Sequence, residues 1–295
     1  MISFFANIFG FVLNFVYEIV QNYGIAIIIF SILIKIIMLP ISIKQQKTMK
    51  KTARIQVKMK EIQAKYKNNP EKLNLETMEL YKKENMSPFG GCFTAIIQII
   101  LLFAVFYLVR SPLTYMKKID GEVINKYTKI INEHQLSSNT AYPEIEIIRE
   151  IDNIKKIENS GNEELELIDI NMEFFGLNLA QVPTNSTDWK SYIIPVLYVL
   201  TSILSMKITN LSTMNKSTNG DVIQNSEEKA LTKKEEEFDP TAQMNKNMNI
   251  MMPIMYVSVA LIAPLGLALY WLANSLLMIL ERLALDKLLK DEEEK

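Results

Sequence analysis

Long apolar stretches alternate with blocks of charged residues along this chain of 295 residues. A helix needs about 20 apolar residues to cross the hydrocarbon core of a bilayer, and within that core only helices and closed barrels satisfy every backbone hydrogen bond. Five stretches have the required character, and only a short turn containing Pro and Gly separates the last two: 22–43, 88–110, 191–207, 249–263 and 264–282. The sequence therefore predicts an all-α integral membrane protein with a core of five transmembrane helices.

The charges between these stretches predict the orientation of the chain, because cytoplasmic loops carry an excess of Lys and Arg. Residues 44–87 hold about 12 basic and five acidic residues, which places them in the cytoplasm. Residues 111–190 hold about eight basic and 14 acidic residues, which predicts a long acidic external loop. By alternation, residues 208–248 form a flexible cytoplasmic loop and residues 283–295 a charged cytoplasmic tail. The N-terminus is then outside and the C-terminus inside.

Residues 1–21 are a separate case. Their apolar side chains recur at helical spacing, and Glu18 is the only charged residue. A cleaved signal peptide would have a basic start and a small-residue cleavage site, which this segment lacks. We expect an amphipathic helix that lies on the outer membrane surface, with a sixth spanning helix as the alternative.

The segments outside the spans also contain local signals. In residues 44–87 one helical face is apolar, and Asn68-Asn69-Pro70 interrupts the helix, which predicts a helical hairpin. This hairpin either only connects two spans or forms a basic paddle that meets the ribosome, a nascent chain, a targeting factor or anionic lipid. The external loop is expected to contain a short helix around residues 145–158 and an apolar patch at residues 174–177.

The overall composition disfavours several classes of protein. The 32 basic residues nearly balance the 33 acidic ones, so bulk charge indicates no nucleic-acid partner. No glycine-rich phosphate-binding motif is present. With one Cys and one His, a zinc site of the usual kind is not expected. We therefore predict a protein that is not an enzyme and that has no metal, cofactor or catalytic residue of its own.

Polar residues inside the predicted spans mark a candidate site. A Lys at the centre of a spanning helix costs roughly 2.5–3.5 kcal/mol on insertion scales, and Lys35 lies within the first span. Other polar residues lie at a similar depth in the inner half of the membrane, on the first, second, third and fifth spans: Ser31, Gln98, Thr201, Ser202 and Asn274. Because polar groups in hydrocarbon need partners or water, we expect one wet groove open to the cytoplasm, although the amides are also typical of hydrogen bonds between helices.

Lys35 has no predicted counter-ion in its own chain. The apolar parts of the five spans, the last of which ends near Leu280, contain no acidic residue. An unpaired buried cation is costly, so the sequence predicts that another molecule supplies a transient acidic partner.

Three motifs follow one another along the chain: YGIAIIIFSILIKIIMLPISIKQQK, NMSPFGGCFTAIIQI and MPIMYVSVALIAPLGLALYWLANSL. Together they resemble the YidC-type membrane protein insertases, relatives of the mitochondrial and chloroplast insertases. The chain is similar to the short form of this family, which lacks the large external domain of other members. The resemblance implies five helices around a hydrophilic groove that is closed on the outside, together with a cytoplasmic helical hairpin.

The resemblance also implies roles for single residues. Lys35 matches a position that is usually Arg and attracts acidic parts of the incoming chain. Ser31, Gln98 and Asn274 fall on polar positions of the groove, and Trp271 matches an aromatic position that contacts substrate. The implied function is an insertase of a bacterial cytoplasmic membrane that receives nascent membrane proteins, independently of or together with the Sec translocon. The ribosome and targeting factors would meet residues 44–87 and the C-terminal tail.

Two other functional classes are considered. A small solute or ion transporter also places polar groups at mid-depth, but the sequence has no inverted repeat and no pair of broken helices. An intramembrane protease would need a Ser–His, Asp–Asp or zinc set, and the only His, His134, lies outside the spans. A purely structural scaffold is a third alternative.

Overall fold

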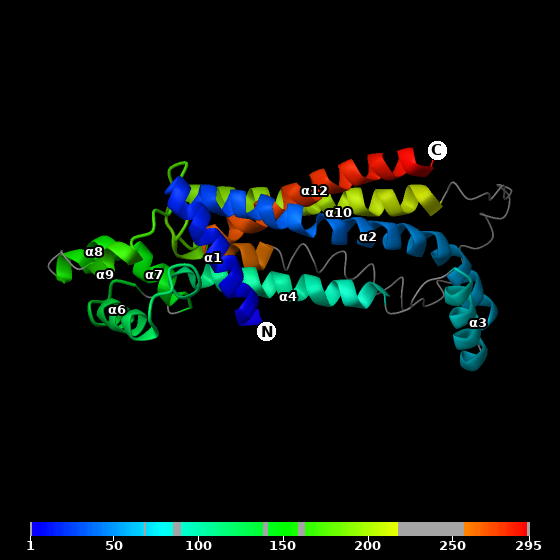
Figure 1. Ribbon diagram of the computed structural model, residues 1–295, viewed down its shortest axis with the longest axis horizontal. Coiled ribbons are helices and arrows are strands. Elements are labelled where there is room, and N and C mark those ends of the chain that lie inside the picture. Colours follow the sequence, from blue (N-terminus) through cyan, green and yellow to red (C-terminus); the bar gives the residue numbers. More distant parts are fainter. Residues whose placement is uncertain are drawn as a thin grey trace.

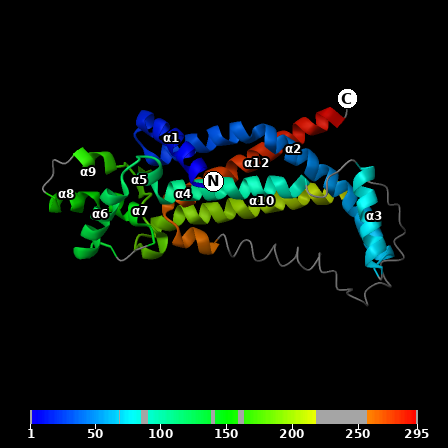
Figure 2. The same cartoon turned by 60° about the horizontal axis from the view of Figure 1, so that its bottom comes forward.

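The computed structural model describes residues 2–67, 69–84, 90–137, 141–158, 163–217 and 257–293. Four long helices run side by side along the longest axis of the molecule (Figures 1 and 2): α2 (Tyr23–Lys65), α4 (Gly90–Arg110), α10 (Ile193–Ser217) and α12 (Leu265–Glu293). Four segments are long and apolar enough to cross a membrane: Ile2–Val20, Tyr23–Thr48, Trp189–Ile208 and Leu265–Leu288. The prediction of an all-α integral membrane protein is confirmed.

The number of spans stays a prediction. The predicted span 249–263 falls largely outside the described residues, of which 257–262 are helical. In the predicted span 88–110, helix α4 begins at Gly90, but only its segment Ile99–Arg110 counts as an apolar helix among the described residues, and this segment is too short to span. The predicted loop 208–248 likewise falls mostly outside the described residues.

The basic block after the first span forms two helices that fold back on each other. Helix α2 continues without a break past Pro40 to Lys65, and α3 (Pro70–Lys83) packs against its end. Pro70 suits the first turn of a helix because its missing N–H needs no partner there, and the Asn69 side chain accepts a hydrogen bond from the Lys72 amide at 3.0 Å. Lys58 pairs with Glu84 at 2.7 Å. We call these residues, 44–84, the paddle.

Helix α1 (Ile2–Val20) crosses α2 and α4 obliquely (Figure 1). One face is buried, with Leu13 fully enclosed, and the opposite face exposes Phe11 and Phe15. Gly10 lies where α1 comes close to the backbone of residue Tyr115, because a Cβ on Gly10 would be 1.9 Å from the Tyr115 carbonyl oxygen. Its oblique course suits the predicted interfacial helix, and its length also suits a span, so both alternatives stay open.

Residues 111–137, 141–158 and 163–192 form a folded unit, which we call the outer subdomain. The sequence predicted this region as a long loop with one short helix and an apolar patch. The predicted helix 145–158 is two helices that meet at Glu150, and the apolar patch 174–177 is a β-hairpin in which Phe174 pairs with Leu177. Its elements are α5 (Pro112–Tyr115), α6 (Gly121–Glu133), α7 (Pro143–Arg149), α8 (Ile151–Ile157), α9 (Glu163–Ile168), β1 (Glu173–Phe174), β2 (Leu177–Asn178) and the 3-10 helices η1 (Pro183–Asn185) and η2 (Trp189–Tyr192).

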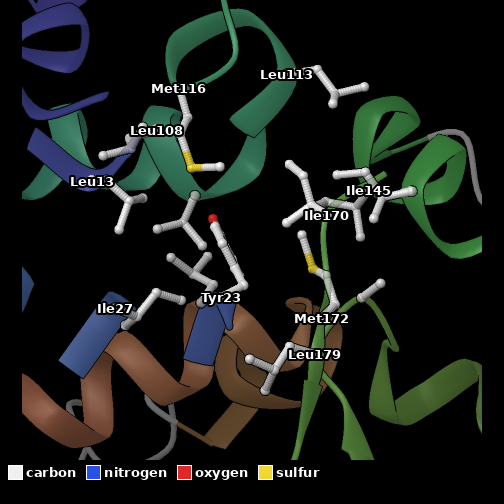
Figure 3. Close-up of a cluster of buried hydrophobic side chains, with 14 of the residues drawn as sticks. Leu13, Tyr23, Ile27, Leu108, Leu113, Met116, Ile145, Ile170, Met172 and Leu179 are labelled. Carbon is white, nitrogen blue, oxygen red and sulfur yellow. The ribbon is translucent and has the colours of Figure 1, made fainter. Parts of the chain in front are cut away.

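One hydrophobic core joins the outer subdomain to the outer ends of the long helices. In Figure 3, side chains from α1, α2, α4 and the outer subdomain meet around Tyr23, and the labelled members include Leu13, Leu108, Ile145 and Met172. Among the described residues, the buried members of this core end at Phe30 on α2 and at Tyr270 on α12. The outer end of the bundle is therefore sealed, and the inner halves of the helices lie beyond the core.

A buried carboxylate ties the outer subdomain together. Glu144 on α7 is 6% exposed, and it accepts hydrogen bonds from the Thr114 amide at 3.0 Å and the Thr114 hydroxyl at 2.6 Å. Burial raises the pKa of the Glu144 carboxyl above its ordinary value of 4.5, and the hydrogen bonds from Thr114 oppose this only in part. Burial also raises the pKa of Glu146, which is 1% exposed and pairs with Arg149 at 2.6 Å.

These raised pKa values predict that the protein is most stable at mildly acidic pH. Between the ordinary and the raised pKa, the folded protein binds more protons than the unfolded chain, so the free energy of unfolding falls as pH rises through that window. Chemical unfolding across this range should show the fall for the wild type and a shallower one for Glu144→Gln. A rise in stability with pH in the same window would contradict the assignment.

Candidate functional site

Lys35 forms an ion pair with Glu281 in the inner half of the bundle. Its Nζ lies 2.9 Å from Glu281 Oε2, and the two side chains are 23% and 13% exposed. The prediction that Lys35 has no counter-ion in its own chain is therefore wrong.

The error arose because the apolar residues of the last span end near Leu280, and the sequence therefore predicted the end of the helix there. Helix α12 does not stop at Leu280 but continues to Glu293. Helices α2 and α12 start at the same level, because a Cβ on Gly266 would be 3.5 Å from the Tyr23 ring. At 1.5 Å per residue, Lys35 lies about 18 Å along α2 and Glu281 about 24 Å along α12. Two long side chains span this offset, so Glu281 reaches the depth of Lys35.

A second polar contact joins the same two helices nearer the paddle. The Gln46 side-chain amide donates to Asp286 at 3.0 Å. At the first contact, Glu281 Oε1 is buried and has no hydrogen-bond partner among the described residues. A carboxylate can accept several hydrogen bonds, so this oxygen leaves part of the capacity of Glu281 unused. The pair is thus polar and only partly satisfied.

The predicted hydroxyl groups are held mostly by their own helices. Ser31 is 3% exposed and donates to the Ile27 carbonyl at 2.7 Å. Thr201 donates to the carbonyls of Leu197 and Tyr198, each at 2.9 Å. Such bonds to a preceding turn satisfy Ser and Thr inside apolar helices. These hydroxyls keep their lone pairs as acceptors, whereas their protons are engaged.

The remaining predicted residues differ in their surroundings. The Trp271 ring packs on Tyr198 of α10 with centroids 5.7 Å apart. Asn274 is half-buried and Ser202 is buried. The Gln98 backbone belongs to α4, but its side chain lies outside the described part of the chain.

Sequence reasoning missed two polar residues on α12. Glu281 was assigned to the end of the span, and Ser275, whose buried hydroxyl has no hydrogen-bond partner among the described residues, lies next to Asn274. A signal for Glu281 was present, because it follows Asn274 by seven residues, two helical turns along one face. The part of the bundle beyond the packed core thus contains a cation, an amide, a hydroxyl and a carboxylate, which belong to Lys35, Asn274, Ser275 and Glu281.

The apolar helices and this pair of opposite charges among them define a multi-pass, all-helical membrane protein with an ionic contact in its inner half. Residues 15–293 match the model of the family described as 60Kd inner membrane protein, and the chain belongs to that family.

Relatives found by sequence comparison carry the name membrane protein insertase YidC. The chain is 45% identical to the one from Fusobacterium nucleatum over 102 residues, which cover 35% of this chain and 50% of the relative. It is 42% identical to the one from Caldanaerobacter subterraneus over 102 residues, with the same coverage of 35% and 50%. For Chlorobaculum parvum the identity is 47% over 102 residues, or 35% of this chain and 17% of the relative. The chain therefore spans half or less of the length of these relatives. The predicted family is confirmed, and these relatives are named as insertases.

Proposed function

We propose that this protein is a membrane protein insertase in which Lys35 exchanges Glu281 for an acidic group of an incoming chain. The observation that carries the proposal is the ion pair itself: it lies beyond the packed core, it is partly exposed, and one oxygen of Glu281 lacks a hydrogen-bond partner within the described chain. Family membership supports the activity.

The energetics of such a pair favour exchange. In a low-dielectric site, the cost of removing two charges from water offsets much of their attraction. Replacing one carboxylate by another at the same cation changes this balance little, so the exchange is close to neutral and reversible. Loss of Glu281 without a replacement would instead leave Lys35 unpaired. Glu281 thus holds the cation in the membrane until a substrate arrives.

The remaining steps follow from the bilayer. A polar tail would enter the inner half of the bundle, where a groove formed around Lys35, Asn274 and Ser202 shortens the hydrocarbon that the tail must cross. Burial of the following apolar segment in lipid, at about 25 cal/mol per Å², then drives its release. A membrane potential adds roughly 2.3 kcal/mol per charge per 100 mV for an acidic tail. No covalent bond changes, so the protein acts as a catalyst of transfer and not as an enzyme.

The paddle and the C-terminal tail are the proposed contacts for partners in the cytoplasm. Exposed basic residues cover the paddle, among them Lys58, Lys65 and Lys72. Such a surface attracts ribosomal RNA, anionic lipid and acidic targeting factors. We propose that the protein lies in a bacterial cytoplasmic membrane with its N-terminus outside, and that it inserts its substrates alone or beside the Sec translocon.

The proposal is tested with purified protein in liposomes. The substrate is a single-span protein with a short N-terminal tail that carries two Asp residues, and the matched control has Asn in their place. We expect the protein to raise the protease-protected fraction over empty liposomes, and more so for the Asp tail. Equal protection with and without the protein would overturn the proposed activity. Equal protection of both tails would remove the role of Lys35.

A further inference from the structure

The turn of the β-hairpin in the outer subdomain has an unusual residue. Phe174 pairs with Leu177, so Phe175 and Gly176 form a two-residue turn. Their φ angles are 49° and 75°, both in the left-handed region. A turn of this kind favours Asn followed by Gly, because Asn tolerates a positive φ better than a bulky residue does. Gly176 fits the turn, whereas Phe175 is strained in it.

Phe175 is also the most exposed large apolar side chain among the described residues. It is 92% exposed, although its ring meets the edge of the Phe174 ring with centroids 4.7 Å apart. An exposed aromatic ring in a strained backbone position is unfavourable twice over if water surrounds it. Contacts with the described residues offset little of this cost, which indicates that something beyond them covers the ring.

The hairpin is fixed to the corner between α1 and α2. The Tyr23 amide donates to the Asn171 carbonyl at 3.0 Å, and the Asn22 side chain donates to the Glu173 carbonyl at 2.6 Å. Phe174 lies against Gly24, where a Cβ would be 2.4 Å from the Phe174 ring. The same Asn22 side chain accepts from the Ile25 amide at 3.0 Å, so it also caps α2. The hairpin therefore has little freedom to move relative to the start of α2.

This attachment gives the depth of Phe175. The apolar run of α2 starts at Gly24 and reaches Ile43, a length of about 30 Å at 1.5 Å per residue, which equals the hydrocarbon core. Gly24 thus lies at the outer boundary of the bilayer, and Phe175, one residue beyond the Phe174 that touches it, lies near the same level. Trp189 starts the third candidate span and is 71% exposed. Trp and Tyr gather at this level in membrane proteins, so Trp189 is a typical residue of the interface.

We propose that Phe175 inserts into the outer interface of the bilayer and anchors the outer subdomain to lipid. The occupant is lipid because the ring lies at the depth where the lipid-facing surface of the spans begins. Lipid burial of the ring offsets the strain of the turn. It also holds the hairpin, and through Asn22 the capped start of α2, at a fixed depth. This role is independent of the proposed insertase function.

The test measures depth in a bilayer. A spin label is placed on Phe175→Cys in a Cys92→Ser background of the full chain, reconstituted in phosphatidylcholine and phosphatidylglycerol nanodiscs. The matched control is Leu167→Cys, whose wild-type side chain is 59% exposed. Leu167 belongs to α9, and this helix lies at the end of the outer subdomain away from the long helices (Figures 1 and 2). We expect the label at 175 to collide more with oxygen, and several-fold less with a water-soluble nickel chelate, than the label at 167.

Two results of the spin-label experiment would overturn the proposal. Equal nickel accessibility at both positions would place Phe175 in water. Shielding from both oxygen and nickel would place it against protein instead of lipid. Phe175→Trp provides a second measurement that keeps an aromatic ring in the turn: its added fluorescence should be quenched by lipids brominated near the headgroup. Quenching by aqueous iodide instead would also overturn the proposal.

Discussion

Lys35→Glu is expected to reduce insertion of the acidic-tailed substrate to the level of empty liposomes. The substitution removes the cation and sets a second carboxylate beside Glu281, so that an acidic tail is repelled where it was attracted. It also breaks a largely buried pair, which costs about 3–5 kcal/mol of stability. Lys35→Arg keeps the charge and should retain most of the activity. The liposome protection assay measures both variants.

Lost activity in Lys35→Glu could also reflect lost folding, and a double variant separates the two causes. Lys35→Met with Glu281→Leu replaces both charges by apolar side chains of similar size, an exchange that is often neutral or stabilising for a buried pair. We expect this variant to keep the thermal midpoint of the wild type and still to lose its preference for the Asp tail. Wild-type preference in the double variant would mean that the pair is only structural.

Gly10→Leu is expected to destabilise the protein by roughly 1–3 kcal/mol or more. Helix α1 approaches α5 so closely at this point that even a Cβ would be 1.9 Å from the Tyr115 carbonyl oxygen. A second contact joins α1 to the segment after α5 and opposes their separation. Lys117 pairs with Glu18 at 2.6 Å, and its Nζ lies 4.7 Å from the Tyr17 ring centroid. A leucine must therefore push α1 away from the outer core.

Gly121→Ala is the matched control for this prediction. Gly121 is the first residue of α6, and a Cβ there would meet no atom within 4 Å. Alanine in a helix loses less conformational entropy than glycine, so the change should be neutral or stabilising by about 0.5–1 kcal/mol. Thermal unfolding of both variants in the same nanodiscs gives the comparison. Equal thermal midpoints for the two variants would show that the structure around Gly10 accommodates a larger side chain.

The sequence predicted the class of fold and the main cation of the site because both rest on the solvent properties of the bilayer. A lysine within an apolar stretch stands out, and Lys35 does lie in the inner half of the bundle. Hydropathy missed Glu281 because it marks where apolar residues end and not where a helix ends. Helix α12 continues past its apolar part, where Glu281 and Asp286 contact α2, and only the offset between α2 and α12 brings the Glu281 carboxylate to Lys35.

The outer subdomain could not be predicted for a different reason. Its helices are short, and each is stabilised by contacts between residues far apart in the chain, such as Thr114 with Glu144 and Tyr17 with Asn171. Local periodicity does not report such contacts. The apolar patch around Phe174 was recognisable in the sequence, but its packing on Gly24 at the start of α2 was not, and the proposed depth of the hairpin depends on that contact.

The exchange of carboxylates at Lys35 is tested most directly by a zero-length carbodiimide crosslink, which joins an amine to a carboxylate in contact with it. In the resting protein, mass spectrometry should detect Lys35 joined to Glu281, whose charged atoms lie 2.9 Å apart. With a ribosome-stalled chain that carries an Asp tail, this crosslink should decline and one between Lys35 and the tail should appear, whereas an Asn tail should leave it unchanged. A Lys35–Glu281 crosslink that persists undiminished with the Asp tail, with none to the substrate, would contradict the account.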